Sequence, residues 1–247
     1  MESSSYEHSA HYDHIDDALR AQWPTFTELE QRMAAFVPQP RNHFAPAREN
    51  EMQRLRTLNP GASDADLSTF VDRQIDVLAS PEYQFHENFG QRLMNHHVIV
   101  VMLSHALCEA IINAVLAIGL AHAKATELFP ILERTDLGRK WISGPKTFAA
   151  GYSFPTGSGL NESLTNLIRQ RNALVHQKID LRIHGQRILK GTSLDWRGYD
   201  HQRRWLRRYF SLPYDLSAFA TDSIRGFPLL ILFDRRPIEA ANEHRRR

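Results

Sequence analysis

Cysteine is almost absent from this chain of 247 residues, since Cys108 is the only one. A single cysteine allows neither an intramolecular disulfide nor a thiolate metal cluster. The first ten residues are polar and lack the basic-then-apolar order of a secretion signal. These absences predict a cytoplasmic protein that is stabilised by a hydrophobic core, and 247 residues are enough to bury one without staples.

Several motifs of well-known enzyme classes are also missing. Gly157-Ser158-Gly159 lacks the lysine and the preceding strand of a phosphate loop, and no glycines flank Ser153 as in a nucleophile elbow. The histidines near the N-terminus and the pair His96-His97 do not have the spacing of known metal ligands. We therefore predict no nucleotide hydrolysis, no serine hydrolysis, no metal site and no cofactor.

One long apolar stretch, residues 98–121, could cross a bilayer by length alone. It carries His105, Glu109 and Asn113, however, and an ionisable group in the middle of a membrane costs a few kcal/mol. Since no second span is present to shelter these groups, we expect a buried helix of a bundle and no membrane partner.

Charge is distributed unevenly along the chain. Residues 1–100 hold 8 Lys and Arg against 15 Asp and Glu, whereas residues 101–247 hold 22 against 13. Such an imbalance indicates that the second half contacts a polyanion.

The sequence predicts a mainly α fold, an up-and-down helical bundle with a helical N-terminal extension and a small β-hairpin insertion. Ser63 and Asp66 resemble a capping box, and Pro81 fits the first turn of one long helix, or of two in series, with a bend near Gly90. Pro24 is expected to break a helix, and a further helix over parts of 126–141 is expected to be interrupted near Pro130. Further predicted elements are helices over 13–22, 27–36, 63–80, 81–124, 162–178, 200–210 and 215–224, a linker over 38–46, a loop over 151–159, a hairpin over 181–189, and a strand or helix turn over 228–233. The expected organisation is an extension and linker over 1–60, a helical domain over 61–235 and a basic tail over 236–247.

The helix predicted from Glu162 has an unusual apolar stripe. Arg171 falls in the middle of this stripe, where a leucine would be expected; the stripe consists of Leu164, Leu167, Ile168, Leu174 and Val175. Burying an unpaired guanidinium costs several kcal/mol. Arg171 must therefore have an anionic partner inside the protein or face a cleft that admits an anionic ligand.

Asn172 and His176 lie four residues apart, so they share one side of this helix next to the stripe. With Arg171 they offer a fixed cation, an amide and an imidazole with an ordinary pKa of about 6.5. This combination suits phosphate chemistry.

The segment Arg171-Asn172-Ala173-Leu174-Val175-His176 resembles the Arg-x4-6-His signature of the HEPN domain superfamily, in which a polar residue commonly follows the arginine. The preceding apolar helix, with His105, Glu109 and Asn113 on one face, is similar to HEPN bundles. The resemblance covers residues 82–225.

The resemblance implies a metal-independent endoribonuclease, a toxin or phage-defence effector, with the motifs of two copies brought together in a homodimer. Arg171 and His176 would be the catalytic pair, with Asn172 assisting and the three polar residues of the long helix in support. An antitoxin or other regulatory protein is a further implied partner. Some HEPN toxins have a tyrosine two positions after the histidine, where this chain has Lys178, which puts in doubt control by a partner nucleotidyltransferase.

The chemistry also follows from the residues themselves. The 2′-hydroxyl of RNA can attack the adjacent phosphate once it is deprotonated, so a proton carrier and a charge stabiliser are sufficient. His176 would move the proton, and Arg171 would neutralise the charge that develops on the phosphorus centre. DNA lacks this hydroxyl and should resist cleavage.

Two alternatives remain open. In the first, Arg171 pairs with Glu109 inside the bundle and His176 only caps the helix end, where the dipole favours a cation. In the second, the chain is a HEPN-type dimeric interaction or RNA-binding module without cleavage.

A second signal lies in residues 196–210, where five arginines alternate with five aromatic residues. This composition suits phosphate contacts and base stacking on single-stranded nucleic acid. The alternative is an amphipathic helix that buries Trp205 and Tyr209 and leaves its arginines solvated. The candidate RNA-binding residues are Arg203, Arg204, Trp205, Arg207 and Arg208.

Overall fold

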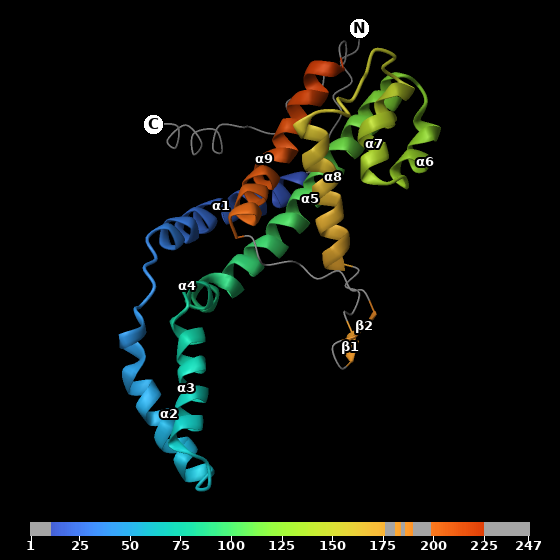
Figure 1. Ribbon diagram of the computed structural model, residues 1–247. Coiled ribbons are helices and arrows are strands. Elements are labelled where there is room, and N and C mark those ends of the chain that lie inside the picture. Colours follow the sequence, from blue (N-terminus) through green and yellow to red (C-terminus); the bar gives the residue numbers. More distant parts are fainter. Residues whose placement is uncertain (1–10, 176–180, 184–185, 190–198, 225–247) are drawn as a thin grey trace. The chain divides into compact units, whose positions relative to one another are not determined.

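The structure is a computed structural model, and it describes residues 11–175, 181–183, 186–189 and 199–224 (Figure 1). Over these ranges the chain is mainly helical, as the sequence predicts. The chain divides into two compact units: unit 1 comprises residues 1–23 and 97–247, and unit 2 comprises residues 24–96. The expected boundary between residues 60 and 61 therefore falls inside unit 2.

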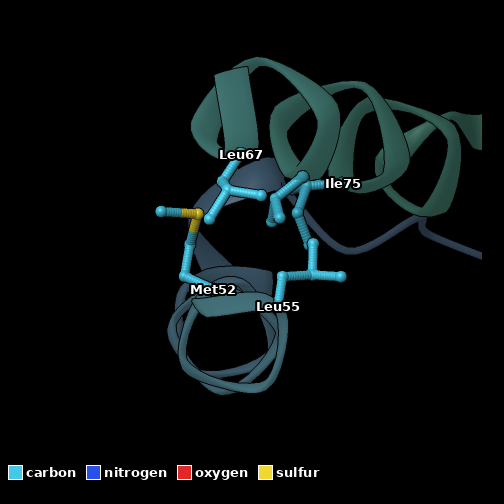
Figure 2. Packing of buried hydrophobic residues seen from close by; sticks show 5 residues of the cluster. Met52, Leu55, Leu67 and Ile75 are labelled. Carbon is cyan, nitrogen blue, oxygen red and sulfur yellow. The ribbon is translucent and has the colours of Figure 1, made fainter. Parts of the chain in front are cut away.

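Unit 2 is built around two helices, α2 (Ala45–Leu58) and α3 (Asp64–Ala79), which lie side by side (Figure 1). Pro46 stands in the first turn of α2, and the Ser63 hydroxyl accepts a hydrogen bond from the Asp66 N–H at 3.1 Å, which confirms the predicted cap. Figure 2 shows the apolar contact between the two helices, formed by Met52, Leu55, Leu67, Val71 and Ile75. Residues spaced three and four apart on each helix thus bury one face against the other.

The segment before α2 was predicted as a linker over 38–46. It contains a short 3-10 helix, Arg41–Phe44, and α2 already begins at Ala45. Ion pairs tie this segment and α2 to α3, since Arg41 binds Asp76 at 2.7 Å and Arg48 binds Asp72 at 2.8 Å.

Two helices run through the division between the units. The first, α1 (His11–Ala34), continues through Pro24, so the predicted break at this proline is wrong. A proline in a helix interior costs about 3 kcal/mol. The side chains on either side of it are buried, Trp23 at 8% exposure and Phe26 at 0%, and each buried aromatic side chain contributes about 1.5–3 kcal/mol, which offsets that cost.

The second is the long helix predicted from Pro81. It consists of α4 (Pro81–Phe85), a π-helical turn (His86–Gly90) and α5 (Gln91–His122). Pro81 occupies the first turn of α4, as expected, and the π-helical turn lies where a bend was predicted near Gly90. The stretch 81–122 is long and apolar enough to cross a membrane, and half of its most apolar window is buried in the structure. A core helix and a membrane span share this composition.

Within unit 1, α5 contributes a nearly continuous series of buried side chains, among them Val100, Val101, Leu107, Ile111, Ile112, Leu116 and Leu120. The helices α7 (Leu137–Ser143), α8 (Gly159–Val175) and α9 (Tyr199–Ser223) add Trp141, Leu164, Leu167, Tyr209 and Phe210 to this core. At Gly119 the ring of Phe148 approaches α5 so closely that an added Cβ would overlap it.

The first part of α1 also belongs to unit 1. The Asp16 carboxylate, which is buried, accepts a hydrogen bond from the Tyr214 hydroxyl and binds Arg20 at 2.7 Å. Trp23 meets Phe210 edge to face, with ring centroids 4.9 Å apart. The first part of α1 therefore packs against α9 and is hydrogen-bonded to it.

Two further prolines lie in the helices of unit 1. The helical stretch expected within 126–141 is interrupted near Pro130, as predicted, because a 3-10 helix (Thr126–Leu128) is followed by α6 (Phe129–Glu133), whose first turn contains Pro130. The helices expected over 200–210 and 215–224 form the single helix α9, which passes through Pro213. Its neighbours Leu212 and Tyr214 are buried, so core packing again holds the helix across a proline.

The predicted hairpin is present as β1 (Leu181–Ile183) and β2 (Gln186–Leu189), which pair antiparallel. The loop over 151–159 is also confirmed, because α8 begins only at Gly159. The end of the helix predicted to Lys178, the segment 228–233 and the basic tail 236–247 lie outside the described residues.

Candidate functional site

The arginine of the predicted catalytic pair lies in the last turn of α8. Arg171 is half-buried and Asn172 is exposed. The Arg171 guanidinium donates a hydrogen bond from Nη1 to Asn172 Oδ1 at 3.1 Å, so these neighbouring side chains hold each other. His176 lies just beyond α8 and outside the described residues.

The three polar residues of α5 share one face at four-residue intervals, as predicted. His105, Glu109 and Asn113 are each half-buried. Burial lowers the pKa of His105, and the positive charge of Arg171 lowers it further. The structure therefore brings Arg171 of α8 and His105 of α5 within electrostatic reach of each other.

A fourth charged group, Lys140 of α7, was not predicted as part of this site. Its side chain is fully buried, and its ammonium nitrogen lies 2.7 Å from an oxygen of Glu109. The signal that could have identified it is the one used for Arg171: Leu137, Lys140 and Trp141 are buried on one face of α7, so a cation replaces an apolar residue in a stripe.

The ion pair between Lys140 and Glu109 bears on the alternative in which Arg171 pairs with Glu109. Glu109 is bound by Lys140, and no ion pair joins it to Arg171. The expectation that Arg171 pairs with Glu109 is therefore wrong. The reason is geometric, because Lys140 reaches Glu109 from inside the core while Arg171 stands at the half-exposed end of α8.

The charges around His105 favour its neutral form. The positive charges of Arg171 and Lys140 lower its pKa, Glu109 raises it, and burial is the largest influence. A neutral imidazole has one ring nitrogen free to accept a proton. Asn113, one turn beyond Glu109, has a buried Oδ1 without a hydrogen-bond partner in the described part of the chain.

Residues 199–210 of the basic and aromatic segment form the first half of α9, and residues 196–198 lie outside the described ranges. Tyr209 is fully buried, as the amphipathic-helix interpretation requires, whereas Trp205 remains half-exposed. The Arg208 guanidinium lies 4.8 Å from the centre of the Trp205 ring, and Trp205 stacks on Tyr209 with centroids 5.9 Å apart. Arg203 is half-buried, while Arg204, Arg207 and Arg208 are exposed.

A cleft of about 570 Å³ opens beside Trp205 of α9, along the first three turns of α8. Asn166 and Arg169 of α8 line it, together with the loop that precedes Gly159. At about 100° per residue, Arg169 and Arg171 point to nearly opposite sides of α8. The cleft and the Arg171 end therefore occupy different faces of this helix.

Comparisons of the chain with protein-family models, with curated proteins and with solved structures found no match. Among the residues that the structure describes, no group of three or more His, Cys, Asp or Glu side chains is placed to hold a metal ion.

Proposed function

We propose that this protein is an endoribonuclease that cuts RNA without a metal, with Arg171 and His176 as its catalytic pair and Asn172 assisting. The observation that carries the proposal is the state of Arg171. Arg171 is half-buried, its positive charge acts on His105, and within the described ranges it has no carboxylate partner, since Glu109 is bound by Lys140.

A half-buried cation without an anionic partner is costly unless a ligand compensates it. The ion pair between Lys140 and Glu109 makes Arg171 more available to a ligand. Lys140 neutralises Glu109, so the positive charge of Arg171 remains available to an anion from solvent. A phosphate of RNA supplies that charge and matches the planar fork of a guanidinium.

The reaction needs two proton movements. His176 accepts the proton of the 2′-hydroxyl, whose oxygen attacks the adjacent phosphorus while the bond to the 5′-oxygen breaks. The products are a 2′,3′-cyclic phosphate and a 5′-hydroxyl, and His176 passes the proton that it accepted to the leaving 5′-oxygen. Arg171 stabilises the extra negative charge on the phosphate oxygens. His105, whose lowered pKa keeps its ring neutral, can accept a hydrogen bond beside Arg171 and supports this step without supplying a proton.

The HEPN resemblance supports the same assignment and adds a homodimer, a toxin or phage-defence role in the cytoplasm, and an antitoxin or regulatory partner. An apolar strip on α5 fits the dimer, since Val98, Ile99 and Met102 are 36–39% exposed just before His105. In sedimentation experiments, Met102→Glu should weaken self-association, and a wild-type monomer would contradict the dimer.

The decisive experiment compares the wild type with His176→Ala and Arg171→Ala on single-stranded RNA in the presence of EDTA. Each variant should lose about 100-fold or more in cleavage rate, and the wild type should leave cyclic phosphate ends. Arg139→Ala is a matched control, because Arg139 is 83% exposed and pairs, among the described residues, with nearby Asp136 alone. Equal rates in all four proteins, or cleavage only with added metal, would refute the proposal.

A second candidate is an RNA-binding or dimeric interaction module that does not cleave. The exposed arginines Arg204 and Arg207 and the cleft beside Trp205 favour it. RNA binding by the wild type without any cleavage would support this candidate over the first.

A further inference from the structure

A pocket of about 270 Å³ lies in unit 2, between the second half of α1 and the first turns of α5. The lining residues occupy one face of each helix. Thr25, Glu28 and Arg32 follow one another at three- and four-residue intervals on α1, and Asn95 and His96 stand three and four residues after Arg92 on α5. Polar side chains of both helices therefore converge on one small space.

The two arginines of this pocket are unusual within their half of the chain. Residues 1–100 contain eight arginines, and five of them form ion pairs with carboxylates, namely Arg20, Arg41, Arg48, Arg54 and Arg56. The structure shows no ion pair or side-chain hydrogen bond between the remaining three and any described residue, and two of these three, Arg32 and Arg92, line the pocket. Glu28 stands four residues before Arg32, a spacing that suits an ion pair, yet no ion pair joins them.

His96 adds an unsatisfied group to the same space. Its Nδ1 atom is buried and has no hydrogen-bond partner among the described residues, and its ring meets Phe26 edge to face at 6.2 Å. Burial lowers the pKa of His96. An anion in the pocket would accept a hydrogen bond from this imidazole and favour its protonated form.

Asn95 and Thr25 complete the set of donors. The Asn95 Oδ1 atom accepts a hydrogen bond from Gln91 Nε2 at 2.9 Å, which directs the amide oxygen to Gln91 and leaves the NH₂ group to donate elsewhere. The Thr25 hydroxyl can donate as well. Glu28 is the acidic member of the lining, and it can accept a hydrogen bond from a hydroxyl carried by the ligand.

We infer that this pocket binds a phosphate group, held by the guanidinium groups of Arg32 and Arg92 and by the side chains of His96 and Asn95. Two guanidinium forks, an imidazole and an amide offer more donors than a carboxylate can accept, and the oxygens of a phosphate match them. The phosphate belongs either to an RNA strand or to a small phosphorylated molecule. The inference goes beyond the ribonuclease proposal, because none of these residues takes part in the chemistry at Arg171.

The test uses the full chain with His176→Ala, so that RNA is not cut. Inorganic phosphate and a short single-stranded RNA are titrated separately, and the imidazole signals of His96 are followed by NMR. Each ligand that uses the pocket should shift these signals saturably. Arg32→Gln and Arg92→Gln should each weaken that binding about tenfold, the loss of one charge-assisted hydrogen bond.

Arg73→Gln is the matched control, because Arg73 is the third of the arginines without an ion pair and does not line the pocket. It should leave the affinity unchanged. If RNA shifts His96 and phosphate competes with it, the ligand is the RNA backbone; if phosphate alone shifts it, the ligand is a small phosphorylated molecule. No saturable shift with either ligand, or an equal loss in Arg73→Gln, would overturn the inference. Circular dichroism of each variant checks that it is folded.

Discussion

The ammonium group of Lys140 lies 2.7 Å from a carboxylate oxygen of Glu109, yet the two side chains differ in exposure, 0% for Lys140 and 40% for Glu109. The two partners therefore depend on each other unequally. Water can still reach the carboxylate if the lysine is lost, whereas nothing in the described contacts replaces the carboxylate for the buried ammonium.

The pair should accordingly respond asymmetrically to substitution. Glu109→Gln leaves a buried ammonium without an anion and should lower the free energy of unfolding by about 3–5 kcal/mol. Lys140→Met keeps most of the side-chain volume and loses one charge-assisted hydrogen bond, at about 1–3 kcal/mol. Urea denaturation of both variants measures the difference. The double variant should be more stable than Glu109→Gln alone, and equal losses in the two single variants would contradict the asymmetry.

The electrostatic link between Arg171 and His105 should appear in a titration. Arg171 lowers the pKa of His105, so Arg171→Gln should raise that pKa toward its ordinary value. NMR titration of the His105 ring measures the change, and Arg73→Gln serves as a control with the same loss of charge in unit 2. An unchanged pKa in Arg171→Gln would show that the two groups are farther apart than the structure has them.

The same group links stability to pH. Because burial and Arg171 lower the pKa of His105 in the folded state, the unfolded chain takes up a proton more readily. The stabilising effect of the neutral ring is present above the unfolded pKa of about 6.5 and is lost as the pH falls below it. The contribution of His105 to this loss should be smaller in Arg171→Gln, as measured by urea denaturation at neutral and mildly acidic pH.

The close approach of Phe148 to α5 should make Gly119 intolerant of a side chain. Alanine is the better helix former by about 1 kcal/mol, but its Cβ would overlap the Phe148 ring. Overpacking of this kind costs about 1–3 kcal/mol, so Gly119→Ala should destabilise the protein despite the helix preference. Gly157→Ala is the control, because a Cβ there meets nothing within 4 Å. Thermal unfolding that is unchanged in both variants would contradict the prediction.

Local signals in the sequence predicted local structure well. The Ser63 cap, the helix start at Pro81 and the loop before Gly159 depend on neighbours in the chain, and each was confirmed. The predicted breaks at Pro24 and between residues 210 and 215 failed, because buried side chains such as Trp23 and Leu212 keep the helix continuous across a proline. Tertiary packing of this kind is not visible in a local window.

The candidate site was predicted only in part, again because tertiary packing is not visible in a local window of sequence. A helical wheel finds Arg171 in an apolar stripe and places His105, Glu109 and Asn113 on one face. It cannot tell which of two cations reaches Glu109, because that depends on how α5, α7 and α8 pack. Lys140 carried the same signal as Arg171, but its helix has only seven residues and offers too short a stripe to stand out. His176 lies outside the described residues, so its role remains a prediction.

The attachment of α1 to α9 affects the order in which the chain can fold. Asp16 accepts a hydrogen bond from Tyr214, and Trp23 packs against Phe210. The partners in each pair are nearly two hundred positions apart in the sequence. On the ribosome these contacts must wait until residues 210–214 have emerged, whereas the α2–α3 hairpin joins close neighbours and can form early. Helix α1 therefore leaves the exit tunnel with an exposed Trp23, which becomes covered only after α9 has emerged.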